Sequence, residues 1–235
     1  MKKMTATLAA CAALSSFGEE PLKILCIGDS ITQGGKTIRE EYTYRWPLFC
    51  MLKDEGVDFS FVGSQKAGLD ADAIWPDYNG EAFDSNHEGY YGAKTAAVRD
   101  KLEEHLPVLD APDIALIHLG TNDQKSEDYT ATIVEPLADM IAQLRAKNPN
   151  VRICVGHLNF NDGPALDIRP LVEAMAERLT TEASPVVTVH HYRNWNEIPM
   201  EKNSDTFDWA HPNPKGQQKM ATAWLDAMRP WIRKK

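Results

Sequence analysis

The chain has 235 residues, of which 43% are hydrophobic and 25% charged, and it contains 14 glycines and 14 prolines. This composition is typical of a globular protein and excludes a disordered chain, a collagen-like repeat and a coiled coil. The 34 acidic and 25 basic residues give a formal charge of −9. Binding to nucleic acid or to an anionic membrane surface requires clustered Lys and Arg, and the longest cluster here is Arg233-Lys234-Lys235. A nucleic-acid partner is therefore excluded, and an anionic membrane surface is disfavoured. No apolar run approaches the roughly 18 residues that span a bilayer, which predicts no membrane span after the N-terminus.

The N-terminus has the pattern of a bacterial export signal. Lys2-Lys3 provides a positive start, and a short apolar stretch follows over residues 4–10. The run Leu8-Ala9-Ala10-Cys11 looks like a lipobox, in which Cys11 would be lipidated and become the mature N-terminus. A plain secretory signal cut before Glu19, or an unprocessed tail, fits the same residues. We therefore expect an exported protein that is periplasmic, secreted or lipid-anchored.

Short apolar segments alternate with helical patterns along the rest of the chain. Strand-sized runs rich in β-branched residues cover residues 22–27, 59–62, 114–119, 151–155 and 186–189. Five helical patterns lie between and after these strands. The first two cover residues 46–55, ended by Gly56, and residues 93–105. The other three are recognised by an apolar face: Ile133, Leu137, Met140, Ile141 and Leu144 in the third; Leu171, Val172, Met175 and Leu179 in the fourth; and Met220, Trp224, Leu225, Met228 and Trp231 in the last, which starts at Pro214. In the third of these, Pro136 marks either a kink or the true start of the helix.

This alternation predicts a parallel sheet covered by helices, that is, one three-layer α/β/α domain over residues 21–235, preceded by a signal segment over residues 1–20. Functional groups in such sheets gather beyond the carboxyl ends of the strands. The stretch 63–92 has little periodicity, and a loop of that length in a compact domain is usually functional.

The cysteines do not predict a disulfide framework. Without Cys11 an odd number remains, and Cys26, Cys50 and Cys154 each have apolar neighbours. We expect them to be buried free thiols. The chain has no Cys-x-x-Cys or His-x-x-x-His spacing that would suggest a metal site.

The first polar cluster at a strand end is Gly28-Asp29-Ser30-Ile31-Thr32-Gln33-Gly34. Ser30 would lie at the carboxyl edge of the sheet, with its backbone N–H directed into the same cleft. A phosphate-binding turn is disfavoured because both the P-loop ending and the three-glycine dinucleotide pattern are absent. An ordinary β–α turn, in which Asp29 and Ser30 satisfy backbone groups, remains open at this point.

Two further clusters follow later strands. Gly120-Thr121-Asn122-Asp123 provides an uncharged amide suited to an oxyanion hole, or simply a helix N-cap. Asp208-Trp209-Ala210-His211 has the spacing at which a carboxylate can orient the imidazole, although a capping Asp beside a surface His fits as well. We expect the remaining histidines to be structural, with His157 the one that could line a pocket at the end of its strand. Together the three clusters supply nucleophile, oxyanion donor, base and orienting carboxylate, the set that acyl transfer needs.

These residues resemble the SGNH/GDSL hydrolase superfamily in block order and spacing from about Leu22 onward. The resemblance implies a flavodoxin-like five-stranded sheet and hydrolysis through an acyl-serine without metal or cofactor. It implies Ser30, Asp208 and His211 as the catalytic triad. The backbone N–H groups of Ser30 and Gly92 and the amide of Asn122 would form the oxyanion hole. Asp29 and Asp123 are interpreted as supports of their turns.

Within that superfamily, Phe61-Val62-Gly63-Ser64-Gln65 and the segment His87-Glu88-Gly89 look most like acetylxylan esterases of carbohydrate esterase family 3. Many relatives have a small residue where this chain has Tyr91, directly before the oxyanion glycine, so Tyr91 would narrow the acyl pocket. Of the six tryptophans, Trp75, Trp195 and Trp209 lie in expected loops where a ring could meet a sugar.

The sequence therefore predicts a carbohydrate O-acetyl esterase acting on an acetylated carbohydrate or another small ester. An arylesterase, thioesterase or lysophospholipase of the same superfamily is the alternative within the enzyme class. A catalytically inactive glycan-binding module is the alternative outside it, and the intact Ser30, Asn122, Asp208 and His211 argue against that module. The sequence does not indicate an oligomeric state.

Overall fold

The computed structural model describes residues 20–37 and 40–232. The expected export signal and Cys11 lie outside these residues, and export therefore stays a prediction. Six parallel strands form one sheet in the order β2-β1-β4-β5-β6, with β3 paired to β1 beyond the end of β2. The strands are β1 (Leu22–Gly28), β2 (Phe59–Val62), β3 (Glu88–Gly89), β4 (Ile114–His118), β5 (Arg152–Gly156) and β6 (Val186–Val189).

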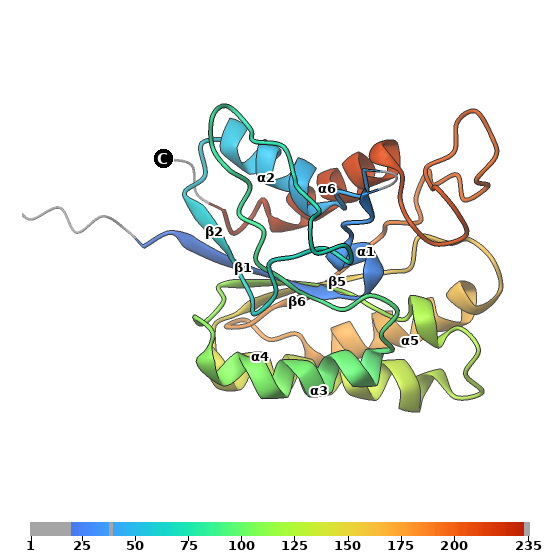
Figure 1. Cartoon of the computed structure of the whole chain (residues 1–235). Coiled ribbons are helices and arrows are strands. Elements are labelled where there is room, and N and C mark those ends of the chain that lie inside the picture. The colour runs from blue at the N-terminus through green and yellow to red at the C-terminus, as the bar shows by residue number, and fades with distance from the viewer. Residues whose placement is uncertain (1–19, 38–39, 233–235) are drawn as a thin grey trace, which may run out of the picture.

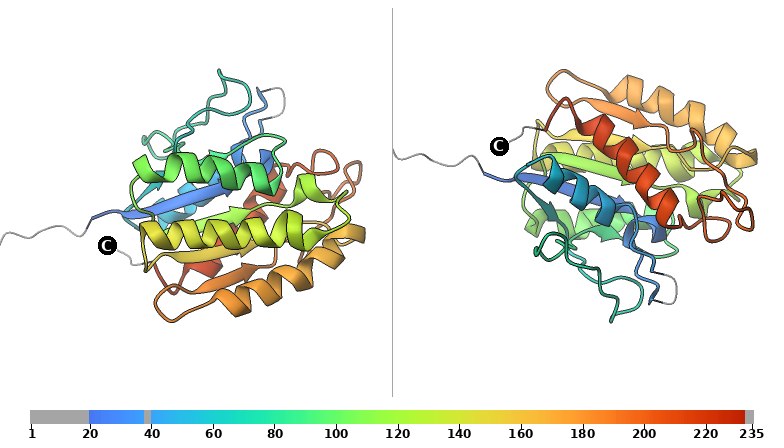
Figure 2. Two further views of the ribbon diagram at one scale, coloured as in Figure 1. Left: turned by 90° about the horizontal axis from the view of Figure 1, so that it is seen from below. Right: turned by 90° about the horizontal axis from the view of Figure 1, so that it is seen from above.

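Helices cover both faces of the sheet, which confirms the three-layer α/β/α architecture (Figure 1). On one face lie α3 (Thr95–His105), α4 (Glu135–Lys147) and α5 (Gly163–Leu179), and on the other lie α2 (Arg45–Asp54) and α6 (Pro214–Met228). The two opposite views separate these groups of helices clearly (Figure 2). Alternate residues of β1 supply the two cores, with Leu25 and Ile27 on the α3–α5 side and Ile24 and Cys26 on the α2–α6 side. This is the pattern of a strand buried on both faces.

The expected strands and helices are present, with ends shifted by a few residues. Gly56 follows α2 at φ +69°, the left-handed conformation expected after a helix end. Pro136 lies in the first turn of α4, and it is preceded by a π-helical turn, η4 (Thr130–Val134). Proline therefore marks the start of the α-helix rather than a kink within it. Trp231 was expected in the apolar stripe of the last helix, but it lies beyond the end of α6 at Met228 and packs half-buried against the α2–α6 core.

The stretch 63–92 contains the short strand β3, which the sequence did not predict. Ile27 and Gly28 pair in register with Glu88 and Gly89, so β3 extends the sheet beside the end of β1. A two-residue strand has no detectable period, and only its partner defines it. β3 brings the residues that follow it, including Tyr91 and Gly92, toward the turn after β1.

Two further sequence predictions, one on the cysteines and one on membrane-spanning segments, concern residues that the structure describes. Cys26, Cys50 and Cys154 are buried free thiols, as expected. Among residues 20–37 and 40–232, no helix combines the length and the apolar character needed to cross a bilayer.

Candidate active site

Ser30 lies directly after β1, at the first residue of the four-residue helix α1 (Ser30–Gln33). The Asp29 carboxylate accepts a hydrogen bond of 2.9 Å from the Ile31 N–H and so caps this helix. Gly28 is required for close packing, since a Cβ there would lie 2.1 Å from Thr32 Oγ1 and 2.7 Å from the His118 carbonyl oxygen. The turn is therefore rigid, and it holds Ser30 at the carboxyl edge of the sheet.

His211 bridges Ser30 and Asp208, although Ser30 and His211 are 181 positions apart in the chain. Its Nε2 lies 3.0 Å from Ser30 Oγ, and its Nδ1 lies 2.9 and 3.0 Å from the two Asp208 carboxylate oxygens. Asp208 Oδ1 also accepts the backbone N–H groups of Ala210 and His211, each at 2.9 Å. These bonds fix the carboxylate, which in turn fixes the tautomer with a proton on Nδ1 and leaves Nε2 to accept from the serine.

The residues expected to form the oxyanion hole lie on segments that adjoin Ser30. Asn122 belongs to the short 3-10 helix η3 (Thr121–Asp123), which follows β4 and has Gly120 as its N-cap, so Asn122 is not itself a cap. Its amide donates to the Ala93 carbonyl at 2.9 Å and lies 3.5 Å from Asp29 Oδ2. Ala93 directly follows Gly92, whose φ of +73° suits glycine. The amide therefore lies between the Gly92 segment and the Ser30 turn.

Arg45 supports the turn that holds Ser30, a role that no sequence motif indicates. Its guanidinium is fully buried and donates to the carbonyls of Thr32 at 2.7 Å, Gln33 at 3.1 Å and Ser85 at 2.9 Å. A cation at the C-terminal end of α1 satisfies carbonyls that the short helix leaves without partners. Burial lowers the pKa of Arg45 to about 10, so it stays charged at neutral pH.

With this geometry established, comparison with known proteins decides the family. A family model described as "GDSL-like Lipase/Acylhydrolase family" matches residues 26–219. The chain belongs to this family. The match includes Ser30, Asn122, Asp208 and His211, and it confirms the superfamily that the motifs resemble. This GDSL-like acylhydrolase is accordingly an ester hydrolase in class.

Three relatives show how far the similarity extends. A multidomain esterase from Ruminococcus flavefaciens is 24% identical over 241 residues; the match covers 90% of this chain, which spans only 29% of that protein. A family 3 carbohydrate esterase from Clostridium thermocellum superposes with a TM-score of 0.69 at 22% identity, covering 90% of this chain and 96% of the other. A carbohydrate esterase of family 3 from Talaromyces cellulolyticus superposes with a TM-score of 0.65 at 22% identity, and the match covers 89% of this chain and 97% of the other. At these identities the structural matches establish the fold.

A second carboxyl group, that of Glu41, lies near His211, and no feature of the sequence indicated it. Its side chain is buried, and Oε1 lies 4.0 Å from His211 Nε2, the nitrogen that faces Ser30. Glu41 also lines a small pocket together with Lys36, Tyr42 and Trp75. No motif surrounds Glu41 in the sequence, because it reaches the site from the loop between α1 and α2 and only tertiary folding brings it there.

Tyr91 lies against the imidazole of His211. Its ring stacks on that of His211, with centroids 5.3 Å apart and planes at 19°. The Tyr91 N–H donates to Gln33 Oε1 at 2.6 Å, which ties this segment to the serine turn. Tyr91 is therefore part of the site, as its position beside Gly92 predicted.

The two aspartates interpreted as supports make structural contacts. The Asp123 carboxylate accepts from Thr95 N at 3.0 Å and Thr95 Oγ1 at 2.8 Å, which joins η3 to the start of α3. Asp29 caps α1, and burial raises its pKa to about 7. These contacts account for both side chains without a part in the chemistry.

Buried histidines make the stability of the acylhydrolase depend on pH. Burial lowers the pKa of His118 to about 4 and those of His87 and His191 well below their usual range. Between about pH 4 and the ordinary value of 6.5, the unfolded chain binds these protons and the folded protein does not. Asp29 has the opposite effect, because its raised pKa lets the folded state hold a proton that the unfolded chain has lost.

We therefore expect the free energy of unfolding to fall as the pH is lowered through 6 toward 4.5. His157 and His190 also have lowered pKa values, so the histidines outnumber the single aspartate with a raised pKa and unfolding takes up protons. We expect the free energy to fall by more than about 1.4 kcal/mol per pH unit at the steepest point, the effect of one proton. Urea unfolding at half-unit pH steps measures this slope. A His118→Gln variant should reduce the slope, and a free energy that stays constant or rises toward pH 4.5 would contradict this explanation.

Proposed function

We propose that this acylhydrolase is a serine esterase that removes O-acyl groups, principally O-acetyl, from carbohydrates through an acyl-serine intermediate. The observation that carries the proposal is the hydrogen-bonded series from Ser30 Oγ to His211 to Asp208 at 2.9–3.0 Å. A nucleophile, a base and an orienting carboxylate within hydrogen-bond distance are the requirements for this chemistry.

The first half of the reaction forms the acyl-enzyme. His211 Nε2 takes the Ser30 proton as Oγ attacks the ester carbonyl, and Asp208 stabilises the imidazolium that results. The buried carboxyl group of Glu41 lies 4.0 Å from Nε2, on the side of the imidazole that faces Ser30. The N–H groups of Ser30 and Gly92 and the Asn122 amide bind the developing oxyanion. His211 then protonates the departing alcohol.

The second half of the reaction hydrolyses the acyl-enzyme and regenerates the Ser30 hydroxyl. His211 deprotonates a water molecule that attacks the acyl carbonyl, and the same donors hold the second oxyanion. Ser30 leaves with the proton from His211, and the carboxylic acid is released. All the proton transfers in both halves use groups of this chain.

Trp209 supports a carbohydrate substrate. Of the three loop tryptophans, Trp75 and Trp195 are buried and cannot offer a face to a sugar, which corrects the expectation for these two. Trp209 is 60% exposed and lies next to Asp208 in the chain. Its ring is stacked on Phe160, with centroids 6.2 Å apart and planes at 19°. A large aromatic surface fixed beside the catalytic residues suits a sugar ring.

We expect Trp209→Ala to raise KM for acetylated xylan roughly 5- to 20-fold, which corresponds to one lost stacking contact of about 1–2 kcal/mol. Initial rates of acetate release on the polymer measure this change. Hydrolysis of p-nitrophenyl acetate should change less than twofold, because this small ester has no sugar ring to stack on Trp209. Trp209→Tyr keeps an aromatic face and should retain most of the affinity for the polymer. Equal losses on both substrates would contradict a sugar-binding role.

Tyr91 supports a preference for acetyl groups. We expect kcat/KM to fall steeply from p-nitrophenyl acetate to butyrate, because a methylene forced against a fixed ring costs about 1–3 kcal/mol, whereas a favourable apolar contact gains about 0.8 kcal/mol. Tyr91→Ala should flatten this fall, and Tyr91→Phe, which keeps the ring, should preserve it. Equal or rising efficiency toward octanoate in the wild type would instead support the lipolytic or thioesterase alternative.

A further inference from the structure

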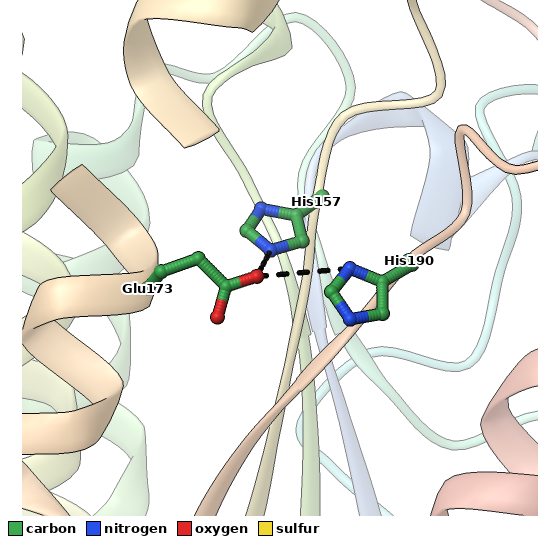
Figure 3. Close-up of side chains that lie close together, drawn as sticks. All are labelled: His157, Glu173 and His190. Carbon is green, nitrogen blue, oxygen red and sulfur yellow. Dashed lines mark hydrogen bonds and ion pairs between the residues drawn. The ribbon is translucent and has the colours of Figure 1, made fainter. Parts of the chain in front are cut away.

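Three potential metal ligands meet at the carboxyl edge of β5 and β6, away from the residues of the proposed mechanism. His157 directly follows β5, His190 directly follows β6, and Glu173 projects from α5 toward both (Figure 3). Glu173 Oε1 lies 2.7 Å from His157 Nε2 and 3.6 Å from His190 Nδ1, and one ligand atom from each residue fits within 4.8 Å of the others. The two imidazoles are stacked, with centroids 5.3 Å apart. No short sequence motif links these positions, so the sequence predicted no such site.

We propose that this cluster is a binding site for a divalent transition-metal ion of the zinc class. His157 Nε2, Glu173 Oε1 and His190 Nδ1 would be its protein ligands, with water completing the coordination. Two imidazoles and one carboxylate are a ligand set that Zn²⁺ accepts in proteins. Bonds of about 2.0–2.1 Å in tetrahedral geometry place neighbouring ligand atoms about 3.3–3.4 Å apart.

The two separations that involve Glu173 can be compared with this geometry, and the two imidazole nitrogens lie within 4.8 Å of each other. The 3.6 Å between Glu173 and His190 is close to the tetrahedral spacing. The 2.7 Å between Glu173 and His157 is a direct hydrogen bond, in which His157 Nε2 donates to the carboxylate. An ion would replace that proton and move the two atoms apart by about 0.6–0.7 Å. Metal binding should therefore displace a proton from His157 Nε2.

The ligands are held in place by the surrounding structure. Thr188 Oγ1, on β6, donates to Glu173 Oε2 at 3.0 Å and so leaves Oε1 directed at the histidines. The His157 N–H donates to the Val189 carbonyl at 2.9 Å, which fixes the ends of β5 and β6 relative to each other. The His157 side chain is 2% exposed, whereas His190 and Glu173 are 29% and 43% exposed. The buried ligand anchors the site and the other two leave it open to an ion and its water.

The charges around the cluster both favour and oppose a cation. The Glu173 carboxyl group is the acidic member of the cluster, and its Oε1 lies 2.7 Å from His157 Nε2 and 3.6 Å from His190 Nδ1. Arg169 and Arg193 act against a cation. The Arg169 guanidinium is held 3.3 Å from the centre of the Tyr192 ring and donates to the Phe160 carbonyl.

The Tyr192 hydroxyl contacts one of the proposed ligand atoms, His190 Nδ1. The hydroxyl lies 3.2 Å from His190 Nδ1 and donates to that nitrogen in the tautomer whose proton is on Nε2. An ion at Nδ1 would displace this hydrogen bond. That loss and the two arginines weaken the site, so we expect micromolar rather than tighter affinity for Zn²⁺.

The consequence of binding would be structural. An ion would tie α5 to the ends of β5 and β6, and the segment that leaves His190 continues to Asp208 and His211. The proposed ligands are different residues from the catalytic ones, so the metal site and the esterase function can be tested separately. Binding of an ion to the folded protein alone stabilises it by mass action.

Titration of the full chain, without a histidine tag and freed of metal with a chelator, tests the proposal. We expect Zn²⁺ to bind with one site per chain in calorimetry and to raise Tm by roughly 5–10 °C at a free concentration about 100-fold above Kd. Co²⁺ should give the visible absorption of a four-coordinate site with nitrogen and oxygen ligands. The chelator itself should leave kcat on p-nitrophenyl acetate unchanged.

Variants locate the ion. Glu173→Gln keeps the size of the side chain, and His190→Asn removes a partly exposed ligand; each should weaken Zn²⁺ binding at least 10-fold and abolish the Co²⁺ spectrum. The matched control is His105→Asn, since His105 is also partly exposed and its Nδ1 also lies beside a carboxylate, 3.2 Å from Glu88. This variant should bind Zn²⁺ as the wild type does. Activity on p-nitrophenyl acetate confirms that each variant is folded.

Three results would overturn the proposal. One is the absence of saturable Zn²⁺ binding to the wild type. Another is unchanged affinity in both Glu173→Gln and His190→Asn. The third is binding that survives in these two variants and disappears in His211→Ala, because the ion would then occupy the catalytic histidine.

Discussion

Replacing Ser30 with alanine should lower kcat on p-nitrophenyl acetate by roughly 10³-fold or more, the usual effect of removing one member of a catalytic triad. The physical reason is the 3.0 Å contact between Ser30 Oγ and His211 Nε2, which alanine removes together with the nucleophile itself. The fold should survive, because the turn is held by Asp29 and Arg45 rather than by the serine hydroxyl. Stopped assays of p-nitrophenol release and a thermal melt measure both properties.

The matched control for this change is Ser64→Ala, which removes a serine hydroxyl outside the site and should leave kcat within twofold. Retention of more than about a tenth of the wild-type rate in Ser30→Ala would mean a loss of less than about 1.4 kcal/mol of transition-state stabilisation. A loss that small is not compatible with Ser30 as the nucleophile.

Replacing Asn122 with alanine should cost on the order of 10²–10³ in kcat with a smaller change in KM, as expected for one oxyanion donor. The Asn122 amide is positioned by the Ala93 carbonyl at 2.9 Å, and its second N–H makes only a long contact of 3.5 Å with Asp29 Oδ2, which the reacting oxygen would replace. Steady-state kinetics on p-nitrophenyl acetate separate kcat from KM. An unchanged kcat with a raised KM would assign Asn122 to substrate binding instead.

Asn122→Ala also removes the hydrogen bond from the Asn122 amide to the Ala93 carbonyl, which holds the segment in place. A control variant is needed to separate this structural effect from the loss of an oxyanion donor. Gln124 has the same amide group, and its Nε2 donates to the Thr121 carbonyl at 3.1 Å within the same segment. Gln124→Ala should therefore disturb the segment to a similar extent and leave kcat nearly unchanged. A comparable fall in kcat in both variants would indicate a local structural effect rather than a lost oxyanion donor.

The sheet and its helices could be predicted because their signals are local. A run such as residues 114–119 is apolar except for His118, as expected of a strand buried on both faces, and this specifies a central strand without knowledge of its neighbours. The polar clusters at Ser30, Asn122 and Asp208 were predictable for the same reason, since each follows a recognisable strand or precedes a helix. Parallel topology then brings them to one edge of the sheet.

The parts that could not be predicted depend on tertiary contacts. Arg45 begins a helix, where a charged residue normally faces solvent, and only the serine turn and Ser85 give its guanidinium buried partners. Glu41 approaches His211 across 170 positions of sequence. The burial of Trp75 was missed because loop membership does not determine exposure; its Nε1 donates to the Tyr42 carbonyl beneath the surface.

The same limit applies to the ligands of the proposed metal site. His157, Glu173 and His190 come from the ends of two strands and the middle of a helix, and sequence spacing does not relate them. Their proximity follows from the pairing of β5 with β6 and from the packing of α5 on β6.

Covalent labelling with a fluorophosphonate tests the central claim most directly, because the reagent reacts with an activated serine and forms a stable adduct. We expect one adduct per chain, located by peptide mass spectrometry on Ser30, with esterase activity lost in proportion to labelling. His211→Ala should label far more slowly, since Ser30 then lacks its base. An adduct on another residue that accompanies the loss of activity, or full activity after Ser30 is completely labelled, would contradict the mechanism.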